Sequence, residues 1–129
     1  MNRTPARLEA HAHLPLHGQS LSMLRLDTVQ TVEECLDRVR ASAAPSGSVE
    51  GWTLGIQIRP EGWSDPRWPT MAELDAASPH RPCCLMSFDH HSVVVNSAAF
   101  AAAGFSPSDA DPPGGVIVRD RAGAPTGVL

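Results

Sequence analysis

Two histidines separated by one residue, His11 and His13, are the side chains of this sequence best suited to metal chemistry. If they lie on a β-strand they project from the same face, because side chains alternate along a strand. Two strand residues span about 6–7 Å, a spacing from which two imidazoles can converge on one divalent ion. Two ligands do not complete a site, and solvated or packed histidines are the alternative interpretation of this pattern.

A second polar cluster, Asp89-His90-His91, directly follows an apolar stretch. An acid beside histidines can supply a metal ligand, a carboxylate that orients an imidazole, or a contact to a substrate. A polar turn after a strand is the simpler explanation, and strand parity alone does not decide whether His90 or His91 faces inward.

The following Asn96 and Ser97 fit helix caps, so a catalytic role for them needs independent support.

The elements that would carry these residues are short. A strand over residues 7–14 would end at the first pair, and the region 15–30 has no regular pattern. Helical spacing, two capping boxes and a terminal glycine predict helices over 32–44, 70–77 and 98–103. Alternation and β-branched residues predict strands over 52–58, 83–88 and 93–95, and a β-hairpin within 116–129.

Length and composition limit the architecture. A chain of 129 residues supports one domain with a modest core, whereas a closed (β/α)₈ barrel typically needs about 250 residues. The 12 prolines and 10 glycines imply many turns. We therefore expect an α+β fold with a small mixed sheet, two to three short helices and long loops.

Charge and residue usage exclude several classes of function. The net charge is −4 and no basic patch is present, which argues against a nucleic-acid partner. All ten basic residues are arginines, so no lysine can act as a Schiff base, a general base or a carbamylated metal ligand.

No apolar run approaches the roughly 20 residues of a membrane span and no signal-peptide pattern is present, so we expect a cytoplasmic protein without a membrane partner. The three cysteines, Cys35, Cys83 and Cys84, lack the spacing of a disulfide framework and fit small core side chains.

Several motifs, taken in order, resemble one known family. They are Pro5-x-x-Leu8-Glu9-Ala10-His11-Ala12-His13, Gly62-Trp63 with Trp68-Pro69-Thr70, Glu73-Leu74-Asp75, Asp89-His90-His91-Ser92, Asn96-Ser97-Ala98-Ala99, and residues 112–120 with 123–129. The order of the set resembles the amidohydrolase 3 (YtcJ-like) family of metal-dependent hydrolases. The resemblance covers the chain from about Pro5 to its last residue, and each motif alone is common.

This resemblance implies a chemistry and a set of roles. His11 and His13 would be metal ligands at the end of the first barrel strand, and the cofactor would be a divalent metal, with zinc expected. The metal would activate water to hydrolyse an amide, N-acyl or N-formyl C–N bond of a small-molecule substrate. His91 would lie near the substrate, supported by Asp89. The sequence departs from the family where His90 replaces a common glycine, and where Pro5-Ala6 and Glu9 replace Pro-Gly-x-x-Asp.

The resemblance also implies an N-terminal fragment of a larger TIM-barrel enzyme, inactive alone, with its catalytic residues expected beyond Leu129. Residues 1–14 would form the first barrel strand, 15–108 an inserted α+β region near the active site, and 109–129 a Pro/Gly linker and truncated β-hairpin. Exposed apolar edges would favour self-association. Two alternatives stay open. One is a small metal- or ligand-binding module closed by the Asp89/His90/His91 cluster, and the other is a structural subunit completing a barrel with a partner chain.

Overall fold

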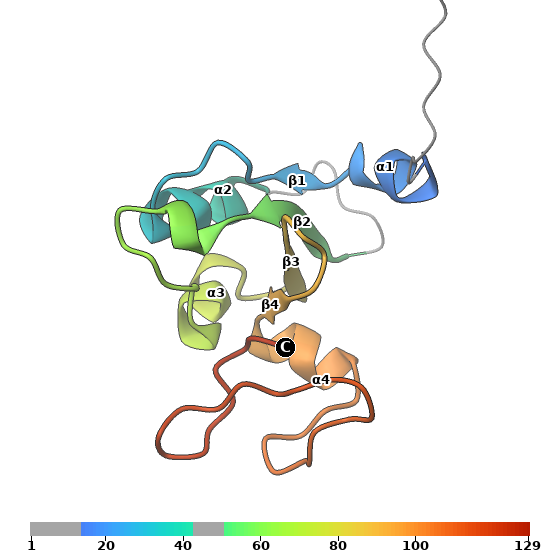
Figure 1. Cartoon of the computed structure of the whole chain (residues 1–129), viewed down its shortest axis with the longest axis vertical. Helices are drawn as coiled ribbons and strands as arrows, with labels where there is room; N and C mark the ends of the chain where they lie inside the picture. Colours follow the sequence, from blue (N-terminus) through green and yellow to red (C-terminus); the bar gives the residue numbers. More distant parts are fainter. Residues whose placement is uncertain (1–13, 43–50) are drawn as a thin grey trace, which may run out of the picture.

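The computed structural model describes residues 14–42 and 51–129 (Figure 1). Its elements, in chain order, are α1 (Leu14–Ser20), β1 (Leu24–Arg25), α2 (Val32–Ser42), β2 (Thr53–Ile58), the 3₁₀ turn η1 (Pro60–Gly62), α3 (Met71–Ala77), β3 (Cys83–Ser87), β4 (Val93–Val95) and α4 (Ser97–Ala102). The strand expected over residues 7–14 lies outside the described residues, except for its last residue, which begins α1. The expected α+β class is confirmed by this mixture of short helices and one small sheet.

The four strands form one mixed sheet in the order β1-β2-β3-β4. β1, β2 and β3 are parallel, whereas β4 runs antiparallel to β3. Between Gly55 and Ile58 the register of β2 shifts, and Gln57 within this bulge has a φ of 65°. The carboxyl ends of three strands therefore meet at one edge of the sheet, which we call the carboxyl edge.

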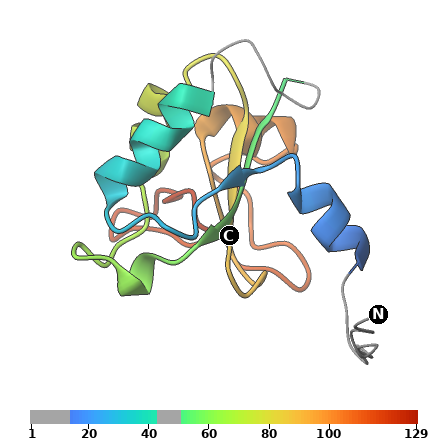
Figure 2. The same cartoon turned by 90° about the horizontal axis from the view of Figure 1, so that it is seen from above.

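Helices α2 and α3 pack together on one face of the sheet (Figure 2). Gly55 is paired with Leu24 and Leu85, and Leu85 with Val94, so these residues point to that face. A side chain at Gly55 would collide there, because a Cβ would lie 2.6 Å from Cδ2 of Leu85. The main core between the helices and the sheet consists of buried apolar residues: Leu26, Val29, Val32, Cys35, Leu36, Val39, Ile58, Trp63, Leu74, Ala77, Cys83, Leu85 and Val94.

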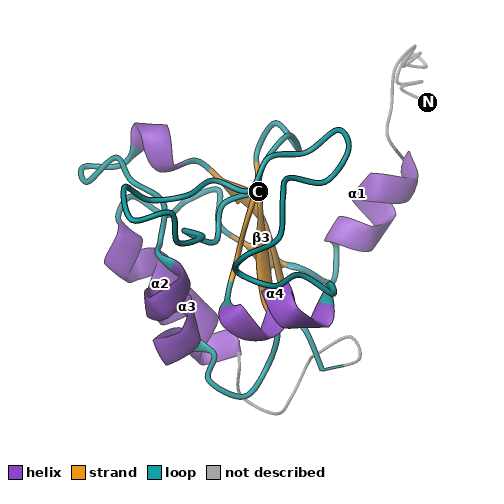
Figure 3. Cartoon of the chain, turned by 90° about the horizontal axis from the view of Figure 1, so that it is seen from below, coloured by secondary structure: helices purple, strands orange, loops and turns teal. Residues whose placement is uncertain are grey.

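Helix α4 and the chain that follows it, residues 103–129 (the C-terminal segment), build a second, smaller core, which includes Val95, Phe100 and Ile117. The Val93 amide donates to the Leu129 carbonyl at 3.0 Å, and the Leu129 amide donates to the Val93 carbonyl at 2.9 Å. The end of the segment therefore extends the sheet beyond β4. Figure 3 shows that most of this segment is loop. Within the described ranges the sheet is open, and the segment adds an antiparallel neighbour at the β4 edge.

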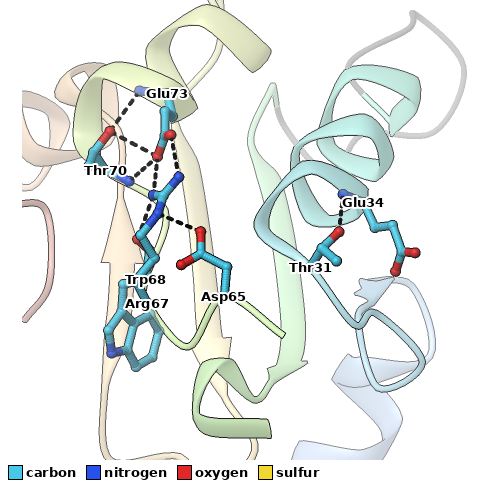
Figure 4. A network of polar contacts seen from close by, with 7 residues as sticks. All are labelled: Thr31, Glu34, Asp65, Arg67, Trp68, Thr70 and Glu73. Carbon is cyan, nitrogen blue, oxygen red and sulfur yellow. Dashed lines mark hydrogen bonds and ion pairs between the residues drawn. The ribbon is translucent and has the colours of Figure 1, made fainter. Parts of the chain in front are cut away.

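The predicted helices are confirmed with small shifts at their ends. The capping box of α3 is complete, since Thr70 accepts from the Glu73 amide at 3.2 Å and the Glu73 carboxylate accepts from the Thr70 amide at 2.8 Å (Figure 4). The box expected before α2 is only half formed. The Thr31 hydroxyl accepts from the Glu34 amide, but the Glu34 carboxylate accepts from the amide of Gln30 rather than from that of Thr31.

Two elements differ from the sequence-based expectation. The region 15–30, expected to be irregular, contains most of α1 and all of β1, so the described residues hold four α-helices where two or three were expected. β1 has only two residues, and its pairing with Gly55 and Ile56 of β2 defines it as a strand. A local sequence pattern does not predict β1, because these two residues form a strand only through their pairing with β2.

Candidate functional site

The histidine pair His11 and His13 lies outside the described residues, so its role as a metal-binding pair stays a prediction. Within residues 14–42 and 51–129, no group of three or more His, Cys, Asp or Glu side chains gathers as a metal site. The structure describes all three residues of the other predicted cluster, residues 89–91. They lie at the carboxyl edge, in the turn that joins β3 to β4. Open sheets with parallel strands bind ligands at this edge.

A network around one carboxylate holds this turn. The buried Ser87 hydroxyl donates to Oδ1 of Asp89 at 2.5 Å, and the same oxygen accepts from the His91 amide at 3.0 Å. The Ser92 amide donates to the Ser87 hydroxyl at 3.1 Å. The Ser87 hydroxyl, and next the His91 amide, hold the pKa of Asp89 below its ordinary value. Asp89 is therefore an ionised acceptor that fixes the turn next to His91, and its role beside a substrate stays a prediction.

The two histidines of the turn are placed differently. His90 has a φ of 62°, in the left-handed region, and its Nδ1 lies 3.0 Å from Sδ of Met86. This backbone conformation favours glycine, because a residue with a Cβ is strained in the left-handed region. His91 is exposed, and its ring has no hydrogen bond within the described part of the chain. Of the two rings, that of His91 is the one free to meet a ligand.

Next to the turn, a cation–π pair also lies at the carboxyl edge. The Phe88 amide donates to the Ile58 carbonyl at 3.1 Å, which joins the ends of β2 and β3. The next residue after β2, Arg59, places its guanidinium carbon 4.0 Å from the centre of the Phe88 ring. Sequence reasoning missed this pair, because its two residues meet only through the pairing of β2 with β3.

Asn96, considered as a cap from the sequence, is a buried structural residue with 1% exposure. Its Oδ1 accepts from the amides of Cys83 and Ala99, each at 2.9 Å. Its Nδ2 donates to the carbonyls of Ser78 at 3.2 Å and Arg81 at 2.9 Å. These contacts occupy the side chain fully and tie α4, β3 and the end of α3 together, leaving no free group for catalysis.

An open groove of about 370 Å³ is lined by none of the residues of the 89–91 turn. Its lining consists of Thr70, Met71, Ala72, Asp75, Ser97, Asp120, Pro125 and Thr126. The Asp75 carboxylate accepts from the Ser97 amide at 2.8 Å and from its hydroxyl at 2.6 Å. Oδ1 of Asp120 accepts from the amides of Ala122 and Ala124. Both carboxylates already accept hydrogen bonds from neighbouring residues. We therefore do not assign a ligand-binding role to this groove.

The cysteines are suited to packing rather than to thiolate chemistry. Burial raises the pKa of Cys35 and of Cys83 to about 12, and it raises that of Cys84 as well. These thiols stay protonated at neutral pH, and a thiol without its thiolate form is a poor nucleophile and ligand.

The described ranges also contain no helix long and apolar enough to cross a membrane.

Comparison with known proteins identifies relatives along nearly the whole chain. The model of the amidohydrolase family matches residues 4–129. YtcJ of Bacillus subtilis (strain 168), a protein named as an amidohydrolase, is 36% identical over 97% of this chain. The N-substituted formamide deformylase of Arthrobacter pascens is 31% identical over 97%.

Two solved structures share this fold, and both are titled as uncharacterized metal-dependent hydrolases. The one from Pyrococcus horikoshii OT3 has a TM-score of 0.63 at 23% identity, and covers 92% of this chain. The one from Pyrococcus furiosus has a TM-score of 0.59 at 31% identity, and also covers 92%. The chain spans only 23% of the length of each of the two relatives named above, and 20% and 23% of the two solved chains. The match over residues 4–129 shows that this chain belongs to the amidohydrolase family.

Proposed function

We propose that this chain is a part of a metal-dependent hydrolase that cleaves C–N bonds of the amide, N-acyl or N-formyl type. The observation that carries the proposal is the family match over residues 4–129. The relative named as an N-substituted formamide deformylase supports the bond type, and the Pyrococcus furiosus structure titled as a metal-dependent hydrolase supports the metal. The complete active site would include residues from the part of the family's length that this chain does not span.

The proposed contribution of this chain to the metal centre is the pair His11 and His13. Two imidazoles one residue apart are a donor set that suits zinc and similar divalent ions. Within the described residues no group of three or more possible ligands forms a metal site of its own. The pair is proposed as part of a site whose other ligands come from the part of the family's length that this chain does not span. When bound, such an ion supplies Lewis-acid activation of water.

The proposed contribution to substrate handling is the turn at the carboxyl edge. Asp89 holds the turn through its bonds with Ser87 and the His91 amide, which leaves the exposed His91 ring available to a substrate. The two ring nitrogens of His91 give it one hydrogen-bond donor and one acceptor in its neutral form. In this proposal the region 15–108 acts beside the active site, and the metal pair acts within it.

Zinc binding tests the metal part of the proposal. We expect the 129-residue chain to bind zinc weakly enough that a chelator removes it readily, because two ligands form an incomplete site. Replacing both His11 and His13 by alanine should abolish this binding, whereas His17→Ala, which changes an exposed histidine of α1, should leave it unchanged. Equal zinc binding by the double variant would refute the assignment. Tight, stoichiometric zinc after the chelator would favour a self-contained metal-binding module.

Turnover tests the division of the active site. The zinc-loaded chain should show no substantial hydrolysis of N-formyl and amide substrates, because the proposal places the remaining catalytic groups outside it. Turnover at an ordinary enzymatic rate of about 10 s⁻¹ would contradict that division.

A further inference from the structure

The pairing of β2 with β3 brings Arg59 and Phe88 together at the carboxyl edge of the sheet. Each residue directly follows a parallel strand, and the bond from the Phe88 amide to the Ile58 carbonyl fixes the two strand ends side by side. The guanidinium lies 4.0 Å from the ring centre, within the range of a cation–π interaction. The pair therefore holds a positive charge in a defined place at the carboxyl edge, beside the turn of residues 89–91.

The guanidinium of Arg59 has no hydrogen-bond acceptor in the described part of the chain. Five other arginines, Arg25, Arg38, Arg40, Arg67 and Arg119, donate from their guanidinium groups to side-chain or backbone oxygens. Arg81 and Arg121, like Arg59, donate to none within the described ranges, but of these three only Arg59 lies over an aromatic ring. The acidic group facing Arg59 is Glu61, whose Oε1 lies 3.9 Å from Nε, beyond hydrogen-bond distance. Both side chains are more than half exposed, and such pairs contribute little.

We propose that Arg59, stacked on Phe88, binds the carboxylate of an anionic substrate. A guanidinium that lies on an aromatic ring keeps its N–H groups free at its edge, and this planar fork matches a carboxylate in a bidentate manner. The inference rests on the proposed hydrolase function, and it narrows the substrate class to N-acyl or N-formyl compounds that carry a carboxylate.

Binding of a matched pair of small molecules tests this inference on the intact 129-residue chain. The probes are N-formylglycine, which carries a carboxylate, and N-formylglycinamide, which is neutral. Nuclear magnetic resonance of the Arg59 side-chain Nε–H group reports contact directly and requires neither metal nor turnover. We expect the acid to shift this signal at millimolar concentration and the amide to bind at least about tenfold more weakly, as loss of a charged bidentate contact predicts.

Variants separate recognition from a structural role. Arg59→Gln should remove the acid-dependent shift of the Phe88 ring signals, and Arg59→Lys should weaken binding because the charge remains but the planar fork is lost. Glu61→Gln should strengthen binding by about twofold to threefold, because a competing carboxylate is removed. Arg121→Gln, at an exposed arginine of the C-terminal segment, is the matched control and should bind like the unmodified chain.

Equal shifts with the acid and the amide, or unchanged binding by Arg59→Gln, would overturn the inference. Because the readout is independent of zinc, its failure is distinguishable from failure of the proposed function. Carboxylate binding at Arg59 in a chain whose zinc test fails would support the anion site and remove only its link to hydrolysis.

Discussion

His90 has a backbone conformation that is unfavourable for a residue with a side chain. Its φ of 62° lies where residues with a Cβ are strained, and the turn is nevertheless held in place by Ser87 and Asp89. Among the residues that the structure describes, the ring has one polar contact, an exposed one to Met86, which contributes little against the strain.

We predict that His90→Gly stabilises the chain by about 1 kcal/mol, because glycine adopts the left-handed region without the penalty of a Cβ. Urea denaturation of both proteins measures the difference in the free energy of unfolding. His80→Gly, at an exposed position without a positive φ, is the matched control and should be neutral or destabilising. Destabilisation by His90→Gly would show that the histidine side chain holds the turn.

Asn96 illustrates a residue whose local role was predictable and whose wider role was not. The sequence indicates a helix cap, and the bond from the Ala99 amide confirms it. The bonds to Cys83, Ser78 and Arg81 join residues 13 to 18 positions away, and no local pattern encodes them. The same limit hid the Arg59–Phe88 pair.

We predict that Asn96→Ala destabilises the chain by about 3 kcal/mol or more, because it removes a cap and leaves buried backbone groups without partners. Thermal or urea unfolding measures the loss. Ser97→Ala, next to it but exposed, should cost about 1 kcal/mol or less. Similar losses in the two variants would contradict the burial and bonding assigned to Asn96.

At the scale of elements, helix α3 begins with the most extensive polar network of Figure 4. Arg67 donates to both oxygens of Glu73 at 2.8 Å, in addition to the capping box with Thr70. The Arg67 guanidinium, more than any other group, lowers the pKa of Glu73 from 4.5 to about 2. The carboxylate therefore stabilises the folded state when it is ionised.

We predict that the stability conferred by Glu73 is full above about pH 4.5 and is lost as the pH falls towards about 2. Glu73→Gln should reduce stability at pH 7 by about 1 kcal/mol, a modest value because the pair is partly exposed. The difference between the two proteins, measured by urea denaturation from pH 7 to pH 2, should disappear at the acid end. A difference that stays constant with pH would show that the ion pair does not contribute. Glu61→Gln serves as the control for losing one surface carboxylate.

Element prediction succeeded where the determinants are local and failed where pairing defines the element. Caps and apolar periodicity located α2, α3 and α4, and apolar or β-branched runs located β2, β3 and β4. The two-residue β1 and the bulge at Gln57 depend on neighbouring strands, so the sequence contains no separate signal for them.

At the scale of the whole molecule, the helices and the C-terminal segment cover much of the sheet but leave large apolar side chains exposed. Leu21 is 72% exposed, Val116 61%, and Phe88 and Val118 both 42%. Single exposed apolar residues are ordinary, whereas several on a chain of this size favour association. We propose that the isolated chain self-associates through such surfaces.

Sedimentation at increasing concentration should therefore show a rising average mass. Replacing Val116 and Val118 together by serine should lower the association, because these two exposed residues alternate with the buried Ile117. A strictly monomeric chain at all concentrations would contradict this prediction.

The central claim is that His11 and His13 form part of a hydrolase metal site that this chain does not complete. X-ray absorption spectroscopy of the zinc-loaded chain tests it most directly, because it reports the number and type of ligands around the ion. We predict two imidazole nitrogens at about 2.0–2.1 Å with solvent oxygens as the other ligands, and loss of the imidazole signal when both histidines are replaced by alanine. Three or more protein ligands, or an unchanged signal in the double variant, would contradict the account.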